Sequence, residues 1–488
     1  MLFNSYHFLF AFLPCVLCIY FICNHFAHQT VAKLWLLAAS WLFYAWWNPI
    51  YLPLLLSSIG FNYLISEKII SLEKGDGRRK HLLVLGLLLN VGALGYFKYM
   101  DFFITNLNWL GADIPLLHLA LPLAISFFSL QQVAYLVDVY RRSDARRSLL
   151  NYCLFVSFFP QLIAGPIVHY KEIVPQLNEP ANWRINYANL SAGLFLFAIG
   201  LFKKVALADT FAQWANNGFD GAAQLNMLEA WIVSYSYTLQ LYFDFSGYSD
   251  MALGLALMFN IKLPQNFNSP YQAASIINLW QRWHMTLTRF INSYIYKPIL
   301  RALPRISFGY GLIASFVAMM VAGVWHGAAW SFVVFGFLQG LAIVINHISR
   351  KLKIAMPAWL GWLLTFHFFS FSLVIFRSLQ WQDAAKVYKG MLGLTGIDSR
   401  VSVPAMFDSH PFWFFSYVQG AEPKALLATI SCLLFVVYGL VHVSLLPNSN
   451  RLTERFTYSW RHLGAVLCLL FISIMLLSNP SVFIYFQF

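Results

Sequence analysis

Two histidines are the strongest candidates for chemistry in this sequence. His326 lies in the run SFVAMMVAGVWHGAAWSF, which contains no other ionisable residue. Ionisable residues inside long apolar runs are rare and often functional. A neutral imidazole, with a pKa near working pH, could act as a general base on a hydroxyl. The alternative is a structural histidine that is hydrogen-bonded near an interface.

His284 lies in the segment NLWQRWHMTLTRF. Read as one helix, the segment has an apolar face and a polar, basic face, about 200° apart at 100° per residue. The apolar face would hold His284 with Trp280, Leu287 and Ile291, and the polar face Asn278, Arg282, Arg289 and Ser293. His284 could be a second site histidine or a satisfied interfacial one. Arg282 and Arg289 could bind a phosphorylated donor or contact lipid headgroups.

Two carboxylates, Asp244 and Asp250, stand in LQLYFDFSGYSDMALG. Residues six apart do not share a helix face, and the intervening Ser246-Gly247-Tyr248 predicts a break in the helix. An Asp at such a break could cap the new helix. It could also orient a histidine or line a polar cavity. No His, Cys, Asp and Glu set has the spacing of metal ligands, so we expect no metal.

Composition defines the elements that must position these residues. Of 488 residues, 59% are hydrophobic and only 10% are charged, against about 25% charged in a soluble domain. These figures exclude a disordered chain, a soluble enzyme and a disulfide-built secreted module. They predict an all-α, multi-pass membrane protein. The net charge of +13 then indicates basic cytoplasmic loops that face anionic lipid, rather than nucleic-acid binding.

Apolar runs predict between ten and thirteen membrane segments, since a span needs about 20 residues. Basic loops, such as those at 68–80 and 141–147, should face the cytoplasm, which places the N-terminus outside. Some segments could be re-entrant or interfacial. The candidate ranges are 6–24, 31–48, 50–66, 82–100, 119–137, 150–168, 189–208, 230–248, 309–325, 329–346, 358–376, 427–446 and 462–486.

Two regions break this pattern. Residues 262–305 are too polar to span and too aromatic for an ordinary loop, so we expect short amphipathic helices at or inside the membrane interface. Residues 309–346 would form a helix of about 57 Å at 1.5 Å per residue, nearly twice the hydrocarbon thickness of about 30 Å. The chain must therefore turn near the middle, and Gly323-Val-Trp-His-Gly327 is the expected place.

Seven sequence motifs follow one another along the chain: FNSYHFLFAFLP, GYFKYMDFF, LPLAISFFSLQQVAYLVDVYR, FFPQLIAGPIVHYKEIVPQL, YFDFSGYSDMALGLALMFNIKLPQNFNSPY, WQRWHMTL and AGVWHGAAWSFVVFGFLQG. In sequence and order they resemble the motifs of the membrane-bound O-acyltransferase superfamily, and within it the bacterial alginate O-acetylation type. The resemblance covers about residues 1–346. It implies a single domain, 1–488, in which residues 347–488 add further spans and an extended loop near 379–426.

The resemblance implies roles for the matching residues. His326 matches the family's essential histidine and would act as base, while His284 matches its second site histidine. His284 would orient the acyl group or stabilise charge on the carbonyl oxygen. The further candidates for binding substrate or donor are Arg282, Arg289, Trp325, Asp244 and Asp250.

The resemblance also implies a setting, a tunnel through the bacterial inner membrane. Acetyl would come from a cytoplasmic thioester, with acetyl-CoA as the expected donor and no bound cofactor. It would reach an extracytoplasmic polysaccharide, alginate-like or another surface glycan. A periplasmic transferase is an expected partner beside membrane lipid. After His284 the chain departs from this branch, because Asn292-Ser293 replace an Arg-Asp pair and a Gly-Gly-Asn-Arg element is missing.

Two other functions stay open from the sequence. The related teichoic-acid D-alanylation enzymes share the W-x-R-W-H-M-T-L segment, so the acyl group could be D-alanyl from a carrier protein docked on basic loops. A polysaccharide transporter or flippase would also have many spans and few charges. It would be expected to show an inverted repeat, which we do not detect in the sequence.

Overall fold

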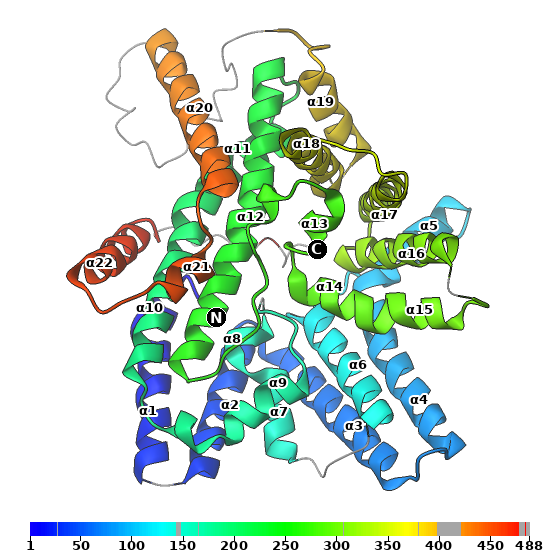
Figure 1. Ribbon diagram of the computed structural model, residues 1–488, viewed down its shortest axis with the longest axis vertical. Helices are drawn as coiled ribbons and strands as arrows, with labels where there is room; N and C mark the ends of the chain where they lie inside the picture. The colour runs from blue at the N-terminus through cyan, green and yellow to red at the C-terminus, as the bar shows by residue number, and fades with distance from the viewer. Residues whose placement is uncertain are drawn as a thin grey trace. The chain divides into compact units, whose positions relative to one another are not determined.

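The computed structural model describes residues 1–26, 28–142, 148–163, 165–305, 307–378, 380–397, 421–477 and 484. Throughout these residues the regular structure is helical and no strand is present, which confirms the all-α class (Figure 1). Within the described ranges, seven helical stretches are long and apolar enough to cross a membrane: Phe8–Phe26, Pro49–Ser71, Gly77–Trp109, Tyr187–Gly221, Phe308–His326, Trp330–Lys351 and Ala358–Arg377. Two shorter apolar helices cover Thr429–Leu445 and Trp460–Met475.

The chain forms two compact units that are interleaved in sequence. Unit 1 contains Met1–Leu201, Tyr248–Gln265 and Thr453–Phe488, and unit 2 contains Phe202–Gly247 and Asn266–Leu452. The long helix α12, Met227–Met258, contributes to both units. Residues 143–147, 398–420 and 478–483 are outside the described residues, so parts of the expected 141–147 basic loop, the 379–426 loop and the last span are untested.

Unit 1 has helices in many of the expected apolar ranges, but the expected span 150–168 is wrong, because that range forms two short helices, Leu149–Ser157 and Phe159–Leu162. In Figure 1, α1 lies beside α2, and α3, α4 and α6 form a second group. Buried amides join α3 to α4, since Asn62 and Asn90 each donate to the other's side-chain oxygen, at 3.2 and 2.7 Å. Its helices are α1 Leu13–Phe26, α2 Gln29–Ala45, α3 Leu52–Ser71, α4 Gly77–Leu94, α5 Met100–Trp109, α6 Ile125–Arg142, α7 Leu149–Ser157, α8 Phe159–Leu162, α9 Tyr170–Asn178, α10 Tyr187–Phe202 and α22 Trp460–Met475.

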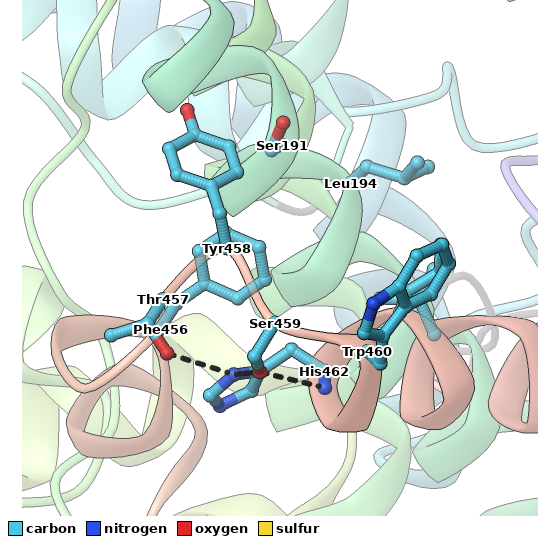
Figure 2. A pocket seen from close by; sticks show the side chains of 10 residues that line it. Ser191, Leu194, Phe456, Thr457, Tyr458, Ser459, Trp460 and His462 are labelled. Atoms are coloured by element: carbon cyan, nitrogen blue, oxygen red, sulfur yellow. Dashed lines mark hydrogen bonds between the residues drawn. The ribbon is translucent and has the colours of Figure 1, made fainter.

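A cavity of about 360 Å³ in unit 1 lies between α10 and the start of α22 (Figure 2). His462 lines it, and its Nδ1 atom is 2.9 Å from Ser459 Oγ and 3.2 Å from Thr457 Oγ1. Ser459 also accepts from the backbone N–H of His462 as the N-cap of α22. These contacts give His462 a helix-capping role, and neither candidate histidine of the site lines this cavity.

Unit 2 contains the segments that carry both candidate histidines. After the π-helical turn η5, Lys203–Ala208, its helices are α11 Asp209–Asn216, α13 Ile276–Trp280, α14 Met285–Ile291, α15 Lys297–Ala302, α16 Phe308–His326, α17 Trp330–Lys351, α18 Ala358–Arg377, α19 Trp381–Met391 and α20 Ala421–Leu445. The short helix α21, Ser449–Glu454, joins it to the last part of unit 1. Residues 262–305 thus form short helices, as predicted.

The expected helix break at Ser246-Gly247-Tyr248 is wrong, because α12 continues through all three residues. A glycine inside a helix costs only about 1 kcal/mol. Ser246 and Tyr248 are each 1% exposed, so close packing on this stretch outweighs that cost. Neither Asp244 nor Asp250 therefore caps a new helix at this position.

Candidate active site

His326 is the last residue of α16, and the chain turns directly after it. Gly327 ends the helix with an extended backbone, and α17 begins at Trp330. This confirms the turn expected from the length of the 309–346 run. Close packing of α16 on α17 needs Gly323, because a Cβ there would overlap the Cα of Gly336 on α17.

Aromatic rings surround the buried imidazole of His326. The ring centroids of Trp325, Phe376 and Phe335 lie 5.1, 5.3 and 6.3 Å from its own. Phe335 is on α17 and Phe376 on α18, so side chains of three helices pack around this imidazole. An imidazole in such surroundings is shielded from water, which strengthens any electrostatic interaction that it makes.

His284 does not lie within a helix, which corrects the expectation of a continuous helical face. It precedes α14 in the left-handed conformation, with φ 43° and ψ 52°. Backbone hydrogen bonds join this turn to the irregular segment around Asn266. Met285 N donates to Asn266 O and Asn268 N donates to Arg282 O, each at 2.9 Å. These long-range bonds compensate for a backbone conformation that is uncommon outside glycine.

One asparagine holds the His284 ring. Asn266 Oδ1 is 3.0 Å from His284 Nδ1. The same oxygen accepts from the backbone N–H of Thr286 at 3.3 Å and from its hydroxyl at 2.9 Å. All three residues are buried, with His284 fully so. The ring is thus fixed from the Nδ1 side.

Trp325 links the two histidines within unit 2. Its ring centroid lies 6.2 Å from that of His284 and 5.1 Å from that of His326. Phe245 of α12 packs edge-on against His284 at 4.8 Å. Burial lowers the pKa of His284 well below its usual value, and the charge of a protonated His326 lowers this pKa further. His284 is therefore a neutral imidazole at neutral pH.

A polar chain supports this site from α17 and α18. Trp280 Nε1 donates to Gln339 Oε1 at 3.2 Å, and Gln339 Nε2 donates to Ser372 Oγ at 2.8 Å. Thr288 Oγ1 donates to the carbonyl of Trp280 at 3.0 Å. These buried bonds tie α13 and α14, on either side of His284, to two membrane helices.

The other predicted residues have mixed positions. Half-buried Arg282 lies beside His284 in the chain, and its Nη1 atom is 3.5 Å from Asn268 O. Half-buried Arg289 is on α14. Asp244 is bound by Lys204, whose Nζ atom is 2.5 Å from Asp244 Oδ1. Asp250 is buried and belongs to unit 1, so its role stays a prediction.

Sequence reasoning missed Asn266, Thr286, Phe245 and Lys204. The polar run PQNFNSP around Asn266 was a visible signal, because amides beside apolar segments need partners. Nothing in the spacing connects it with His284. Among the described residues, no group of three His, Cys, Asp or Glu side chains could hold a metal ion.

Comparison with known proteins decides the family. Residues 82–380 match the model of the membrane-bound O-acyltransferase family, MBOAT. The chain belongs to this family. It is 42% identical to a peptidoglycan O-acetyltransferase of Helicobacter pylori, over 100% of this chain and 98% of that protein. It is 35% identical to a probable alginate O-acetylase, AlgI, of Pseudomonas aeruginosa, over 80% of this chain and 75% of that protein.

A more distant relative is the teichoic acid D-alanyltransferase of Bacillus subtilis, at 28% identity over 46% of this chain and 60% of that protein. The predicted resemblance is thus confirmed, and this MBOAT protein is a multi-pass membrane O-acyltransferase. Family membership favours an enzyme over a transporter or flippase.

Proposed function

We propose that this MBOAT protein is an inner-membrane acetyltransferase that uses acetyl-CoA for O-acetylation of peptidoglycan. The acceptor is suggested by the relative named peptidoglycan O-acetyltransferase, which aligns over 98% of its length. The departure from the alginate-type pattern after His284 is consistent with this choice. The observation that carries the chemistry is the pair of buried histidines joined by Trp325 in unit 2.

The transfer needs one base and a dry site. In our proposal His326 removes the proton of the acceptor hydroxyl while its oxygen attacks the thioester carbonyl. The new C–O bond forms, the C–S bond breaks, and the thiolate leaves with the proton that His326 returns. Aromatic walls around His326 exclude water, which would otherwise hydrolyse the thioester.

The route of the acetyl group across the membrane involves a second protein in this proposal. A periplasmic transferase would receive the acetyl group on a hydroxyl and pass it to the glycan strand. Membrane lipid surrounds the enzyme, and the donor approaches from the cytoplasm. The basic loops near 68–80 would face the donor side by the positive-inside rule.

The test measures ester-linked acetyl on purified peptidoglycan in a deletion strain. Complementing genes would carry wild type, His326→Ala and His347→Ala. His347 lies on α17 and is the control histidine. Wild type and His347→Ala should restore acetyl, and His326→Ala should not, at equal protein level. Full acetylation by His326→Ala would refute the base assignment.

The donor is tested separately with membranes and radiolabelled acetyl-CoA. Label should reach base-labile esters in wild-type membranes only. Transfer of D-alanyl from a charged carrier protein, with none from acetyl-CoA, would replace the acetyl proposal with the D-alanyl one. Loss of acetyl from another surface glycan in the deletion strain, with peptidoglycan unchanged, would replace the acceptor.

A further inference from the structure

We propose that Asn266 is a positioning residue that fixes His284 as the tautomer protonated on Nδ1, so that Nε2 presents its lone pair to the reacting groups. The inference rests on the proposed acyl transfer for its kinetic consequence. The tautomer itself can be tested without any activity.

The oxygen of the Asn266 amide is identified by its neighbours. A backbone N–H can only donate, and the N–H of Thr286 points at one atom of this amide, 3.3 Å away. That atom must therefore be the oxygen and not the NH₂ group. The hydroxyl of Thr286, 2.9 Å from the same atom, satisfies the same assignment by donating to it.

The tautomer of His284 follows from that oxygen. His284 Nδ1 is 3.0 Å from Asn266 Oδ1, and an amide oxygen can only accept. Nδ1 must therefore carry the proton. A neutral imidazole has one donor and one acceptor nitrogen, and burial keeps this ring neutral by lowering its pKa. Nε2 is consequently an acceptor.

This result changes the chemistry expected of His284. An Nε2 lone pair cannot donate a hydrogen bond to a negatively charged carbonyl oxygen, which was one of the two roles expected from the sequence, the other being to orient the acyl group. It can accept a hydrogen bond from a second hydroxyl or N–H group of the acceptor and so align the attacking hydroxyl, whose own proton goes to His326. His284 would then bind the acceptor side of the reaction rather than the thioester oxygen.

Two separable contacts make Asn266 suitable for a mutational test. Its backbone carbonyl accepts from Met285 N at 2.9 Å and helps to hold the left-handed turn. Its side-chain oxygen contacts the ring, at 3.0 Å from His284 Nδ1. A side-chain substitution therefore removes the tautomer control while leaving the backbone bond in place.

The surroundings of the ring predict how each variant behaves. His326 on α16 is the titratable group whose charge acts on His284. The contacts from α12 and α16, Phe245 and Trp325, are uncharged rings, and Asp244, next to Phe245, is bound to Lys204. A new carboxylate at position 266 would thus add a negative charge beside Nδ1, which raises the pKa of His284.

The kinetic experiment compares three variants in the full-length protein. Asn266→Leu should lower kcat by on the order of 10²-fold, the lower range for proton-transfer groups, with little change in KM for acetyl-CoA. Asn266→Asp should retain the tautomer and much of the rate near neutral pH. Because the carboxylate raises the pKa of His284, the activity of this variant should begin to fall at a higher pH than that of wild type as the pH is lowered. Asn278→Leu is the matched control, because Asn278 is a half-buried residue on α13, and this variant should behave as wild type.

The spectroscopic experiment records the imidazole nitrogens of ¹⁵N-histidine protein in lipid, with His284→Gln used to identify the signals. We expect protonated Nδ1 and bare Nε2 in wild type and in Asn266→Asp, and a mixture in Asn266→Leu. A protonated Nε2 in wild type would overturn the proposal, as would Asn266→Leu with wild-type kcat. If wild type transfers no acyl group from any donor, the proposed function fails and the spectrum still decides the tautomer.

Discussion

Replacement of Lys204 by methionine should strongly destabilise the protein. Lys204 lies on η5 with its side chain 2% exposed. Its Nζ atom is 2.8 Å from Asp209 Oδ1 and 2.5 Å from Asp244 Oδ1, and the Asp244 side chain is also 2% exposed. Methionine has a similar length but no charge, so Lys204→Met would remove the cation that contacts both carboxylates.

The size of the expected loss of stability follows from the burial of these charges. Breaking a buried ion pair by removing one partner costs about 3–5 kcal/mol, because the remaining charge stays out of water. Asp209 is 16% exposed and can be partly hydrated. Asp209→Asn should therefore cost clearly less than Lys204→Met, since it keeps the bond between Lys204 and Asp244.

The assay measures the fraction of folded, monodisperse protein that survives heating in detergent. It compares wild type, Lys204→Met, Asp209→Asn and the double variant Lys204→Met/Asp244→Leu. The double variant removes both charges and should recover at least half of the stability lost in Lys204→Met, because no charge is then left alone at the Asp244 position. Equal stability of Lys204→Met and wild type would refute the reasoning. So would a double variant that is less stable than Lys204→Met.

Three further predictions concern the packing and pH response of the site. Gly323→Val should displace α16 from α17 and lower both acyl transfer and thermal stability. Gly309→Val, at a position where a Cβ meets nothing within 4 Å, should lower neither. A transfer assay and a heating curve measure the two effects. Gln339→Leu should lower the free energy of unfolding by about 1–3 kcal/mol, because it leaves the buried Trp280 Nε1 without its acceptor. Comparing the thermal unfolding of this variant with that of Gln339→Glu measures the loss. Because the folded pKa of His284 is lowered, its contribution to stability is complete above about pH 6.5 and is lost below that value, by up to about 1.4 kcal/mol per pH unit. His284→Gln should show a flatter loss of stability between pH 7 and 5; an unchanged slope would contradict the neutral assignment.

Much of the fold was predictable because membrane thickness constrains it. The 309–346 run is too long for one span, and small residues flank its middle. The observed end of α16 at His326 agrees with that arithmetic. The short helices between 262 and 305 were also predictable, because their polar and aromatic residues suit neither a span nor a loop.

The geometry around His284 could not be obtained from periodicity. Helical spacing describes contacts between residues three or four apart. The left-handed turn at His284 depends instead on hydrogen bonds to a segment 18 residues earlier. A continuous helix through this segment would have been consistent with every local rule. It would have put the imidazole on the same helix face as Leu287, whereas in the structure His284 precedes α14.

Asp244 shows how buried ion pairs can be found from sequence in other membrane proteins. A lone carboxylate in an apolar segment costs too much free energy to stay unpaired, so its presence predicts a base in another segment. The expected span 230–248 holds Asp244 as its only charge, and the span 189–208 holds Lys203 and Lys204. Balancing charges between spans would have paired these two segments. The structure shows that Lys204 is the base that binds Asp244, and that Asn266, a neutral acceptor, orients His284.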